Sequence, residues 1–222
     1  MASTVEQRAL QSLGTSGSAI YDMVRRIVSE RVSPSSTAKL LDVGCGTGNM
    51  FKFVGDLVQS YEGVDVLRYD GFPSELVFHQ LDLDSGKANL TDKYADFVIA
   101  VETIEHLENP RAFLRELARL CKPNGWVIVT TPNQLSLLSK LTLLLKNQFN
   151  AFTDTSYPAH ITALLEIDLR RIAAECKLKN VSISYTCSSR IPGTSLHWPR
   201  LACKLSKRLF SDNISLISQS PQ

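Results

Sequence analysis

Three glycines at alternate positions, in the sequence DVGCGTGN, are the strongest chemical signal in this chain. Gly44, Gly46 and Gly48 follow a short apolar run at residues 38–43, and a segment with helical character follows at residues 50–58. Because glycine lacks a β-carbon, this backbone can turn sharply and approach a ligand closely. The free N–H groups at a helix N-terminus bind polar or anionic ligands. The pattern therefore predicts a nucleotide-type binding site between a strand and a helix.

The spacing of the glycines distinguishes between nucleotide cofactors. A dinucleotide-binding turn has the pattern G-x-G-x-x-G, whereas Asn49 occupies the position of its third glycine here. An acidic residue followed by G-x-G-x-G, as in Asp42, Gly44, Gly46 and Gly48, resembles the first motif of the seven-stranded S-adenosylmethionine-dependent methyltransferases. The resemblance implies S-adenosylmethionine as the cofactor and methyl transfer as the reaction.

Acidic side chains further along the chain have the type and position needed to bind a nucleoside. Asp65 ends a predicted strand, about twenty residues beyond the glycines, where a carboxylate in doubly wound folds accepts hydrogen bonds from the ribose. The family resemblance implies a second acid for the adenine amino group, with Asp82 as our candidate and Asp84 as a competing one. The predicted cofactor-binding residues are Asp42, Gly44, Cys45, Gly46, Asn49, Asp65, Val66, Asp82, Leu83 and Val101.

A second group of chemically competent residues lies in the sequence ETIEHL. His106 is the candidate general base, because imidazole titrates near physiological pH; the alternative is a structural histidine bonded to a backbone carbonyl. Residues three and four apart share one face of a helix or tight turn, so Glu102, Glu105 and His106 are expected to converge, with His160 completing the set.

This E-x-x-E-H box with a later histidine resembles the divalent-metal site of small-RNA 2′-O-methyltransferases and, in part, that of ubiquinone-biosynthesis O-methyltransferases. The resemblance implies a magnesium or manganese ion, held by Glu102, Glu105, His106 and His160, that binds the acceptor hydroxyls and lowers their pKa. The alternative is that these side chains bind no metal and that His106 acts alone.

Strands and helices alternate in the first part of the chain, which indicates right-handed crossovers and a parallel sheet. The stretch from Asp96 to Asn133, with its EHL box and a KPNG turn at residues 122–125, resembles the ubiquinone-biosynthesis type of methyltransferase. The resemblance implies an α/β fold with a doubly wound, mostly parallel seven-stranded sheet, helices on both faces and an antiparallel last strand. We predict strands at residues 38–43, 61–66, 76–80, 96–101, 126–130, 181–187 and 213–217, and helices at residues 18–32, 50–58, from Asn109, 164–177 and 198–210, the last of them basic and amphipathic.

The remaining segments complete the domain organisation. Residues 134–157 are rich in leucine and follow the fifth strand, so we expect a helical lid insertion above the strand ends, which contacts the acceptor, covers its own core or forms a homodimer contact. Residues 1–17 are expected to form a loose N-terminal arm, and residues 18–222 a single methyltransferase domain.

Composition narrows the functional classes. The 222 residues include 24 basic and 22 acidic side chains, which gives no general signal of nucleic-acid binding and favours a small-molecule partner. The five cysteines are scattered and lack C-x-x-C spacing, so they indicate neither a disulfide framework nor a zinc site. This cysteine usage is typical of a protein in the reducing cytoplasm. No uncharged apolar run is long enough to cross a bilayer.

We therefore predict a cytoplasmic S-adenosylmethionine-dependent methyltransferase that acts on an oxygen or nitrogen of a small-molecule acceptor. The apolar side of the lid would suit an apolar acceptor. Two alternatives stay open at this point. One is a catalytically inactive S-adenosylmethionine-binding scaffold protein, and the other, weaker one is a nicotinamide-dependent oxidoreductase.

Overall fold

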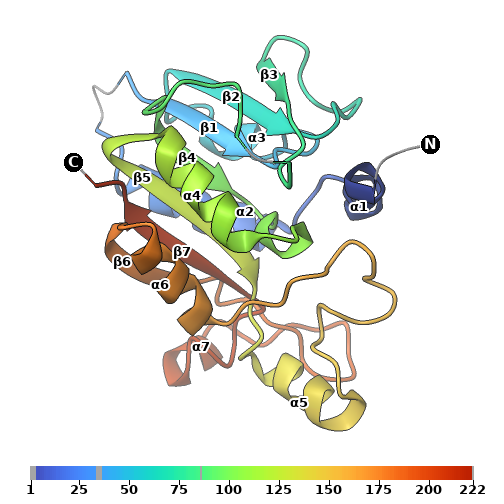
Figure 1. The fold of residues 1–222 in the computed structure, drawn as a ribbon. Coiled ribbons are helices and arrows are strands. Elements are labelled where there is room, and N and C mark those ends of the chain that lie inside the picture. Colours follow the sequence, from blue (N-terminus) through green and yellow to red (C-terminus); the bar gives the residue numbers. More distant parts are fainter. Residues whose placement is uncertain (1–3, 34–36, 86, 222) are drawn as a thin grey trace.

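Seven strands form one sheet in the computed structural model, which describes residues 4–33, 37–85 and 87–221 (Figure 1). The strand order is β3-β2-β1-β4-β5-β7-β6. The strands are β1 (Lys39–Val43), β2 (Ser60–Asp65), β3 (Val77–Gln80), β4 (Ala95–Ala100), β5 (Cys121–Pro132), β6 (Lys179–Tyr185) and β7 (Asn213–Gln219). Strand β7 runs antiparallel to β5 and β6, and the other paired strands are parallel. The predicted fold class is confirmed.

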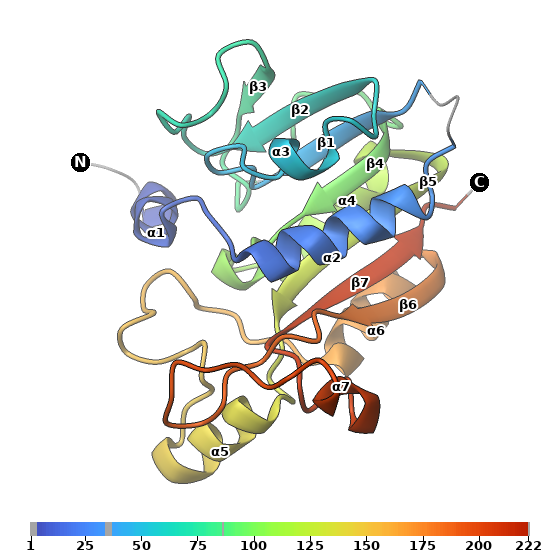
Figure 2. The same cartoon turned by 180° about the vertical axis from the view of Figure 1, so that it is seen from behind.

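Helices cover both faces of this sheet. The helices of the described residues are α1 (Thr4–Ser12), α2 (Ser18–Ser29), α3 (Phe51–Val54), α4 (Pro110–Leu120), α5 (Leu137–Lys146), α6 (Glu166–Glu175) and α7 (Ala202–Leu205), together with a 3-10 turn η1 (Ile104–His106). Helices α4 and α6 lie on the face seen in Figure 1, and α2 and α3 lie on the opposite face (Figure 2). Among the described residues, no helix has both the length and the apolarity needed to cross a membrane.

Successive apolar residues in the central strands serve opposite faces of the sheet. Leu40 packs in the cluster that contains Ile27 of α2, whereas its neighbour Leu41 packs in the cluster that contains Leu117 of α4. All four of these side chains belong to residues that are at most 2% exposed. Side chains alternate between the faces of a strand, so a strand buried on both faces is apolar at every position. This burial explains the near-continuous apolar runs in the sequence.

Local sequence signals set the start of α4. The Asn109 side chain accepts a hydrogen bond from the Ala112 N–H at 2.9 Å, and Pro110 occupies the first helical position. An asparagine cap satisfies a backbone donor that has no partner within the helix, and proline has no N–H to satisfy there. The predicted helix start at Asn109 is thereby confirmed.

The KPNG segment is not the separate turn that we predicted. It lies inside β5, where the pairing with β4 shifts from Ala95 with Cys121 to Phe97 with Trp126. The extra residues are accommodated by a bulge in which Asn124 has a φ of 61°. Asparagine tolerates this left-handed conformation better than most residues, so the strand continues through the segment.

Two predicted helices are much shorter in the structure. The helix predicted at residues 50–58 is reduced to α3, and the basic helix predicted at residues 198–210 is reduced to the four residues of α7. Pro199 precedes the second one, and Cys203 within α7 forms a disulfide with Cys187. The expectation that the cysteines form no disulfide framework is therefore wrong at this pair. The two cysteines are 16 residues apart and belong to no recognisable cysteine motif, and the fold brings them together.

Candidate functional site

A cavity of about 290 Å³ lies at the carboxyl ends of β1, β2 and β4. Eight of the ten predicted cofactor-binding residues line it, namely Asp42, Gly44, Cys45, Gly46, Asp65, Val66, Leu83 and Val101. The other two are not among the described residues that line it. Asn49 accepts a hydrogen bond from Lys52 Nζ at 2.8 Å, and Asp82 accepts one from the Asp84 N–H at 2.9 Å.

The glycine turn and Asp65 hold each other in place at the floor of this cavity. Gly44 and Gly46 have φ angles of +80° and +51°, which favour a residue without a β-carbon. The two carboxylate oxygens of Asp65 accept hydrogen bonds from the N–H groups of Gly46 at 2.8 Å and Val66 at 2.7 Å. Burial raises the pKa of Asp65, and these backbone donors oppose that shift. The carboxyl group is thus fixed where β2 ends, with oxygen lone pairs left for a ligand.

Asp42 is a buried carboxyl group with one unused oxygen. Its side chain is 1% exposed, and one oxygen accepts a hydrogen bond from the Tyr61 hydroxyl. The other oxygen has no hydrogen-bond partner among the described residues. Burial raises the pKa of Asp42 to about 7, and the hydrogen bond from Tyr61 opposes that shift. A buried oxygen without a partner, beside a cavity, is a site for a ligand that donates hydrogen bonds.

We expect this pKa to make the protein less stable as the pH rises. An unfolded aspartate titrates near pH 3.9, whereas Asp42 in the folded protein titrates near pH 7. Between these values the folded state binds more protons, so the free energy of unfolding falls with increasing pH. Asp42→Asn should remove this dependence and gain on the order of 2 kcal/mol relative to the unmodified protein between pH 4 and pH 7. Urea unfolding without cofactor measures the difference.

The matched control is Asp22→Asn on the exposed side of α2. It leaves Asp42 in place, so the free energy of unfolding should still fall between pH 4 and pH 7. An Asp42→Asn curve that stays parallel to that of the unmodified protein would contradict the assignment of a raised pKa.

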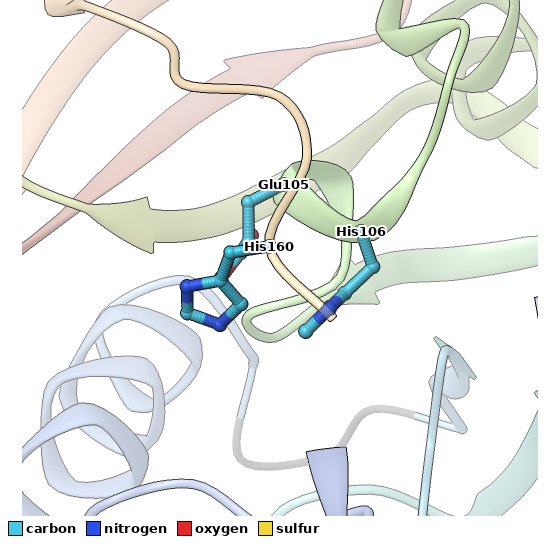
Figure 3. Close-up of side chains that lie close together, drawn as sticks. All are labelled: Glu105, His106 and His160. Atoms are coloured by element: carbon cyan, nitrogen blue, oxygen red, sulfur yellow. The ribbon is translucent and has the colours of Figure 1, made fainter. Parts of the chain in front are cut away.

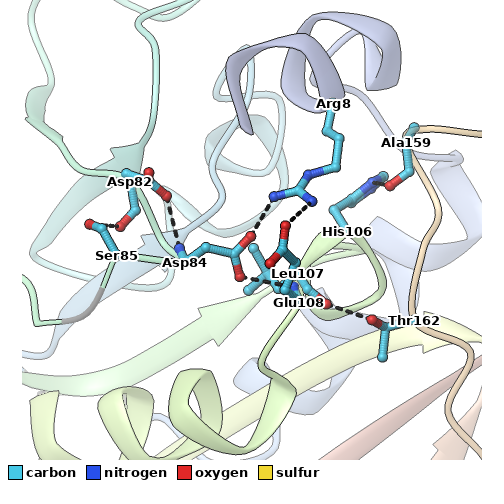
Figure 4. A network of polar contacts seen from close by, with 9 residues as sticks. All are labelled: Arg8, Asp82, Asp84, Ser85, His106, Leu107, Glu108, Ala159 and Thr162. Carbon is cyan, nitrogen blue, oxygen red and sulfur yellow. Dashed lines mark hydrogen bonds and ion pairs between the residues drawn. The ribbon is translucent and has the colours of Figure 1, made fainter. Parts of the chain in front are cut away.

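Helix α1 closes the cavity, although we predicted a loose arm at residues 1–17. Arg8 is 5% exposed and forms ion pairs with Asp84 at 2.5 Å and Glu108 at 3.1 Å (Figure 4). The Tyr69 hydroxyl donates to the Ala9 carbonyl at 2.5 Å. The residues of α1 that line the cavity are Val5, Arg8, Ala9 and Ser12. A loose arm is therefore wrong for residues 4–12, because tertiary ion pairs fix them; residues 1–3 lie outside the described part.

The segment after α1 rests directly on the glycine turn. The Gly14 carbonyl accepts a hydrogen bond from the Thr47 N–H at 2.9 Å, and Tyr21 accepts one from the Ser16 N–H at 2.8 Å. Tyr21 itself lines the cavity. The cavity also has lining residues that we did not predict, namely Gly14, Thr15, Ser16, Gly17, Ile20, Met50, Tyr69, Thr103 and Leu107. For Thr15 and Ser16, the only sequence feature that could have indicated a place near the ligand is the pair of flanking glycines, Gly14 and Gly17.

Replacing Arg8 should loosen this closure. Arg8→Met keeps the apolar part of the side chain but leaves Asp84 without its buried partner, so α1 should leave the cavity more often. We expect the affinity for a ligand in the cavity to fall by about fivefold, which corresponds to about 1 kcal/mol. Calorimetric titration with S-adenosylhomocysteine, the demethylated form of the cofactor that the sequence resemblance implies, measures this affinity. The control is Arg111→Met, whose ion pair with Glu175 is solvent-exposed, and an equal loss in both variants would argue against the closure.

Glu105, His106 and His160 lie close together (Figure 3), and the two histidines line the cavity. One ligand atom from each residue lies within 4.8 Å of those of the other two. Glu105 is completely buried, and neither of its carboxylate oxygens has a hydrogen-bond partner among the described residues. Burial raises the pKa of Glu105, and the nearby Glu102 adds to that shift. Two orphaned carboxylate oxygens at this depth fit a bound cation.

Each of the two histidines is held by a contact between its Nδ1 atom and a backbone carbonyl. His106 Nδ1 lies 2.8 Å from the Ala159 carbonyl, and His160 Nδ1 lies 2.6 Å from the Ala151 carbonyl. If Nδ1 donates to each carbonyl, the proton is fixed on that nitrogen and the Nε2 lone pair is free. Burial lowers the pKa of both histidines, that of His106 to about 4. They are thus neutral at pH 7, as ligation requires, while a pKa near 4 makes His106 a weak general base.

Glu102 is not part of this cluster, although we expected it to be. Its carboxylate accepts hydrogen bonds from Thr130 Oγ1 at 3.0 Å and Asn213 Nδ2 at 2.6 Å. Burial raises the pKa of Glu102 to about 8, against the effect of these two donors. Its φ of 52° breaks the regular turn that the spacing argument assumed. Of the four predicted metal ligands, the structure therefore brings three together.

Known proteins resemble this chain in both sequence and structure. A family model described as a methyltransferase domain matches residues 18–183. The ubiquinone biosynthesis O-methyltransferase of Rickettsia typhi is 31% identical over 105 residues, which cover 45% of this chain and 43% of that protein. The protein of the same description from Xanthomonas oryzae pv. oryzae is 28% identical over 162 residues, 65% of each chain. These matches span less than two thirds of the relatives' own length.

The fold also matches solved structures over nearly its whole length. A SAM-dependent methyltransferase from Archaeoglobus fulgidus has a TM-score of 0.64 and covers 94% of this chain and 96% of its own. The sequence identity is 19%, so this likeness shows the fold alone.

Proposed function

Because this chain belongs to the S-adenosylmethionine-dependent methyltransferases, we propose that it moves the methyl group of that cofactor to a hydroxyl oxygen of a small-molecule acceptor. The observation that supports an oxygen acceptor is the cluster of Glu105, His106 and His160 beside the cofactor cavity. The O-methyltransferase names of the relatives agree with it. Neither the scaffold nor the oxidoreductase alternative is favoured.

The residues of the cavity fit S-adenosylmethionine. The unpartnered oxygen of Asp42 suits the amino group of the methionine part, since a buried acceptor gains most from a charged donor. Asp65 has lone pairs left for the ribose hydroxyls, at the strand end where doubly wound folds bind them. The glycine turn leaves room for close approach of the ligand. In this proposal the chain binds and orients the cofactor, and α1 excludes water from it.

The cluster also fits a divalent cation, which Glu105, His106 and His160 would hold. A bound cation would supply Lewis acidity that lowers the pKa of an acceptor hydroxyl. Magnesium prefers an all-oxygen environment, whereas imidazole ligands favour a transition-metal ion over magnesium. We therefore propose manganese over magnesium. In this arrangement His106 acts as a ligand and not as a lone base, which agrees with its lowered pKa.

The proposal predicts transfer of a radiolabelled methyl group from S-adenosylmethionine to small hydroxylated aromatic compounds. Catechol is a suitable probe, because its adjacent hydroxyls can both reach one cation. We expect S-adenosylhomocysteine and an O-methylated product to form in equal amounts, with manganese added. Label transfer to amine probes but not to hydroxyl probes would contradict the oxygen acceptor, and cofactor binding without transfer to any probe would favour the scaffold alternative.

Two further points remain proposals. We propose that residues 134–157 influence which acceptor is used; the described residues among them do not line the cofactor cavity. We also propose the cytoplasm as the location, and in such a reducing compartment the Cys187–Cys203 disulfide would be open.

A further inference from the structure

The segment between β6 and β7 is closed into a loop by the Cys187–Cys203 disulfide. The two cysteines are 16 residues apart in the chain, and their Cα atoms lie 5.5 Å apart. Inside the loop, Arg190 and His197 form an isolated antiparallel bridge, and α7 carries Cys203. The loop lies at the end of the sheet where β7 begins (Figures 1 and 2). The family model matches residues 18–183, so both cysteines lie beyond the matched part.

The residues beside Cys187 hold the backbone that leads into β7. The Cys187 N–H donates a hydrogen bond to Ser211 Oγ at 2.9 Å, and the Asp212 N–H donates to the Ser188 carbonyl at 2.9 Å. The Asp212 carboxylate accepts a hydrogen bond from Ser189 Oγ at 2.7 Å. Ser189 and Ser211 are completely buried. The start of β7 is therefore anchored to one end of the disulfide.

The first residue of β7 reaches the cavity. Asn213 Nδ2 donates a hydrogen bond to Glu102 Oε2 at 2.6 Å, and Glu102 lines the cavity. The backbone of Glu102 has a φ of 52°, which is unfavourable for a residue with a β-carbon and persists only where the surroundings hold it. Thr130 holds the other carboxyl oxygen of Glu102. Hydrogen bonds and a few consecutive residues of the chain therefore connect Cys187 to the wall of the cavity.

The cysteine pair is open to a small thiol reagent. Cys187 is partly exposed, whereas the free cysteines Cys45 and Cys121 are only 6% and 1% exposed. Thiol–disulfide exchange begins at one sulfur of the bond and depends on access to it. Residues 188–211 carry five basic side chains and no acidic one, and this positive charge attracts an anionic thiol peptide such as glutathione. The Cys187–Cys203 pair is therefore suited to reversible oxidation by glutathione disulfide.

We propose that Cys187 and Cys203 are a reversible oxidation site that controls how firmly the cavity wall at Glu102 is held. In the oxidised form the disulfide restrains the loop and, through it, the start of β7. In the reduced form the loop should open about 100-fold more often, because the disulfide no longer excludes its open conformations. In the cytoplasm, the bond would close when the glutathione pool becomes oxidised.

The oxidant in this step is glutathione disulfide. The thiolate of one cysteine attacks a sulfur of glutathione disulfide, so that a mixed disulfide forms and one glutathione leaves. The thiolate of the second cysteine then attacks the protein sulfur of the mixed disulfide, the Cys187–Cys203 bond forms and the second glutathione leaves. The two protein thiols lose two electrons, glutathione disulfide gains them, and the two thiol protons end on the two glutathione thiols.

Equilibration with glutathione tests the reversibility. The full chain is incubated in buffers with graded ratios of reduced to oxidised glutathione, its free thiols are alkylated, and the Cys187–Cys203 bond is quantified by mass spectrometry. We expect the pair to change from open to closed within this series. The control Cys176→Ser removes a free, partly exposed cysteine and should leave the midpoint unchanged. A pair that stays closed in reduced glutathione alone, or open in oxidised glutathione alone, would overturn the proposal.

Hydrogen exchange tests the link to the cavity without any ligand. Backbone amides of residues 188–212 should exchange about 100-fold faster in the reduced chain than in the oxidised one. The Glu102 N–H, which donates to Thr130 Oγ1 at 2.9 Å, should exchange at least about threefold faster after reduction, whereas the amides of β2 should not change. Cys187→Ser with Cys203→Ser should behave as the reduced chain in both buffers. Equal exchange of residues 188–212, or of Glu102, in the two redox forms would contradict the proposed control of the wall.

The affinity for S-adenosylhomocysteine measures the consequence for binding, and only this step rests on the cofactor assigned to the cavity. The oxidised chain should bind this ligand about threefold more tightly than the reduced one, because part of the reduced population lacks the ordered wall. Asn213→Ala removes the donor to Glu102 and should abolish the redox difference, whereas Asn89→Ala at an exposed position should keep it. A difference that survives Asn213→Ala would overturn the route through Glu102. Absence of binding to either form would contradict the cofactor assignment instead, and the hydrogen-exchange result would still decide the proposal.

Discussion

Replacing Asp65 with alanine should weaken the binding of S-adenosylhomocysteine by about 30-fold, or about 2 kcal/mol, the loss expected for charge-assisted hydrogen bonds to two ribose hydroxyls. The carboxylate lies at the end of β2, 7% exposed, and is held by the N–H groups of Gly46 and Val66. Calorimetric titration measures the loss. The control is Asp70→Ala, whose side chain is exposed in the loop after β2, and it should leave the affinity unchanged.

Because Asp65 also anchors the glycine turn, its replacement can lower the affinity in a second way, by displacing that turn. A ligand analogue that lacks both ribose hydroxyls separates the two routes. If Asp65 binds the ribose, the mutation should cost this analogue much less than it costs S-adenosylhomocysteine. An equal loss for both ligands would show that Asp65 acts only by positioning the turn, and an unchanged affinity for S-adenosylhomocysteine would remove Asp65 from the site.

Replacing His160 with alanine should lower the affinity for manganese by at least about 100-fold. Removing a residue that only hydrogen-bonds to a metal ligand already lowers metal affinity by about 10- to 100-fold, so removing a ligand should cost at least as much. His160 supplies one of the three side chains whose ligand atoms lie within 4.8 Å of one another. Manganese electron paramagnetic resonance reports binding without any acceptor or methyl transfer. The histidine control is His197→Ala, which is exposed and outside the cluster.

Glu105→Gln gives an independent check of the same site, because it keeps the size of the side chain and replaces the carboxylate ligand with a neutral amide. It should lower manganese affinity as strongly as His160→Ala. Failure of the unmodified chain to bind manganese below millimolar concentrations would remove the metal and leave the cluster as a buried structural contact. The S-adenosylhomocysteine affinity of both variants should remain unchanged, which separates loss of metal from loss of fold.

The predicted site residues that the structure brings to the cavity are mainly those whose positions have local causes. The glycines and Asp65 belong to one strand-helix-strand unit, β1-α3-β2, and their positions follow from its geometry. Eight of the ten predicted cofactor residues line the cavity, and six of these eight belong to that unit or directly follow it; Leu83 and Val101 follow β3 and β4. Asp82 does not, because its carboxylate caps the backbone of its own turn at Asp84. The predicted convergence of four metal ligands was wrong at Glu102, because its left-handed backbone turns the side chain toward β7.

The parts that were missed depend on contacts between distant segments. Helix α1 has nine residues, too few for a convincing periodicity, and its position depends on ion pairs from Arg8 to residues 76 and 100 positions away. The pairing of Cys187 with Cys203 follows from the path of the chain after β6, which periodicity does not reveal. Residues 198–210 have helical spacing, yet α7 has only four residues, because tertiary constraints override propensity.

Calorimetric titration of the unmodified full chain with S-adenosylhomocysteine, and separately with NADH, tests the assignment of the cavity most directly. We predict that one molecule of S-adenosylhomocysteine binds per chain with micromolar affinity and that NADH gives no binding heat, because Asn49 stands where a dinucleotide site needs glycine. Binding of NADH without binding of S-adenosylhomocysteine would contradict the account.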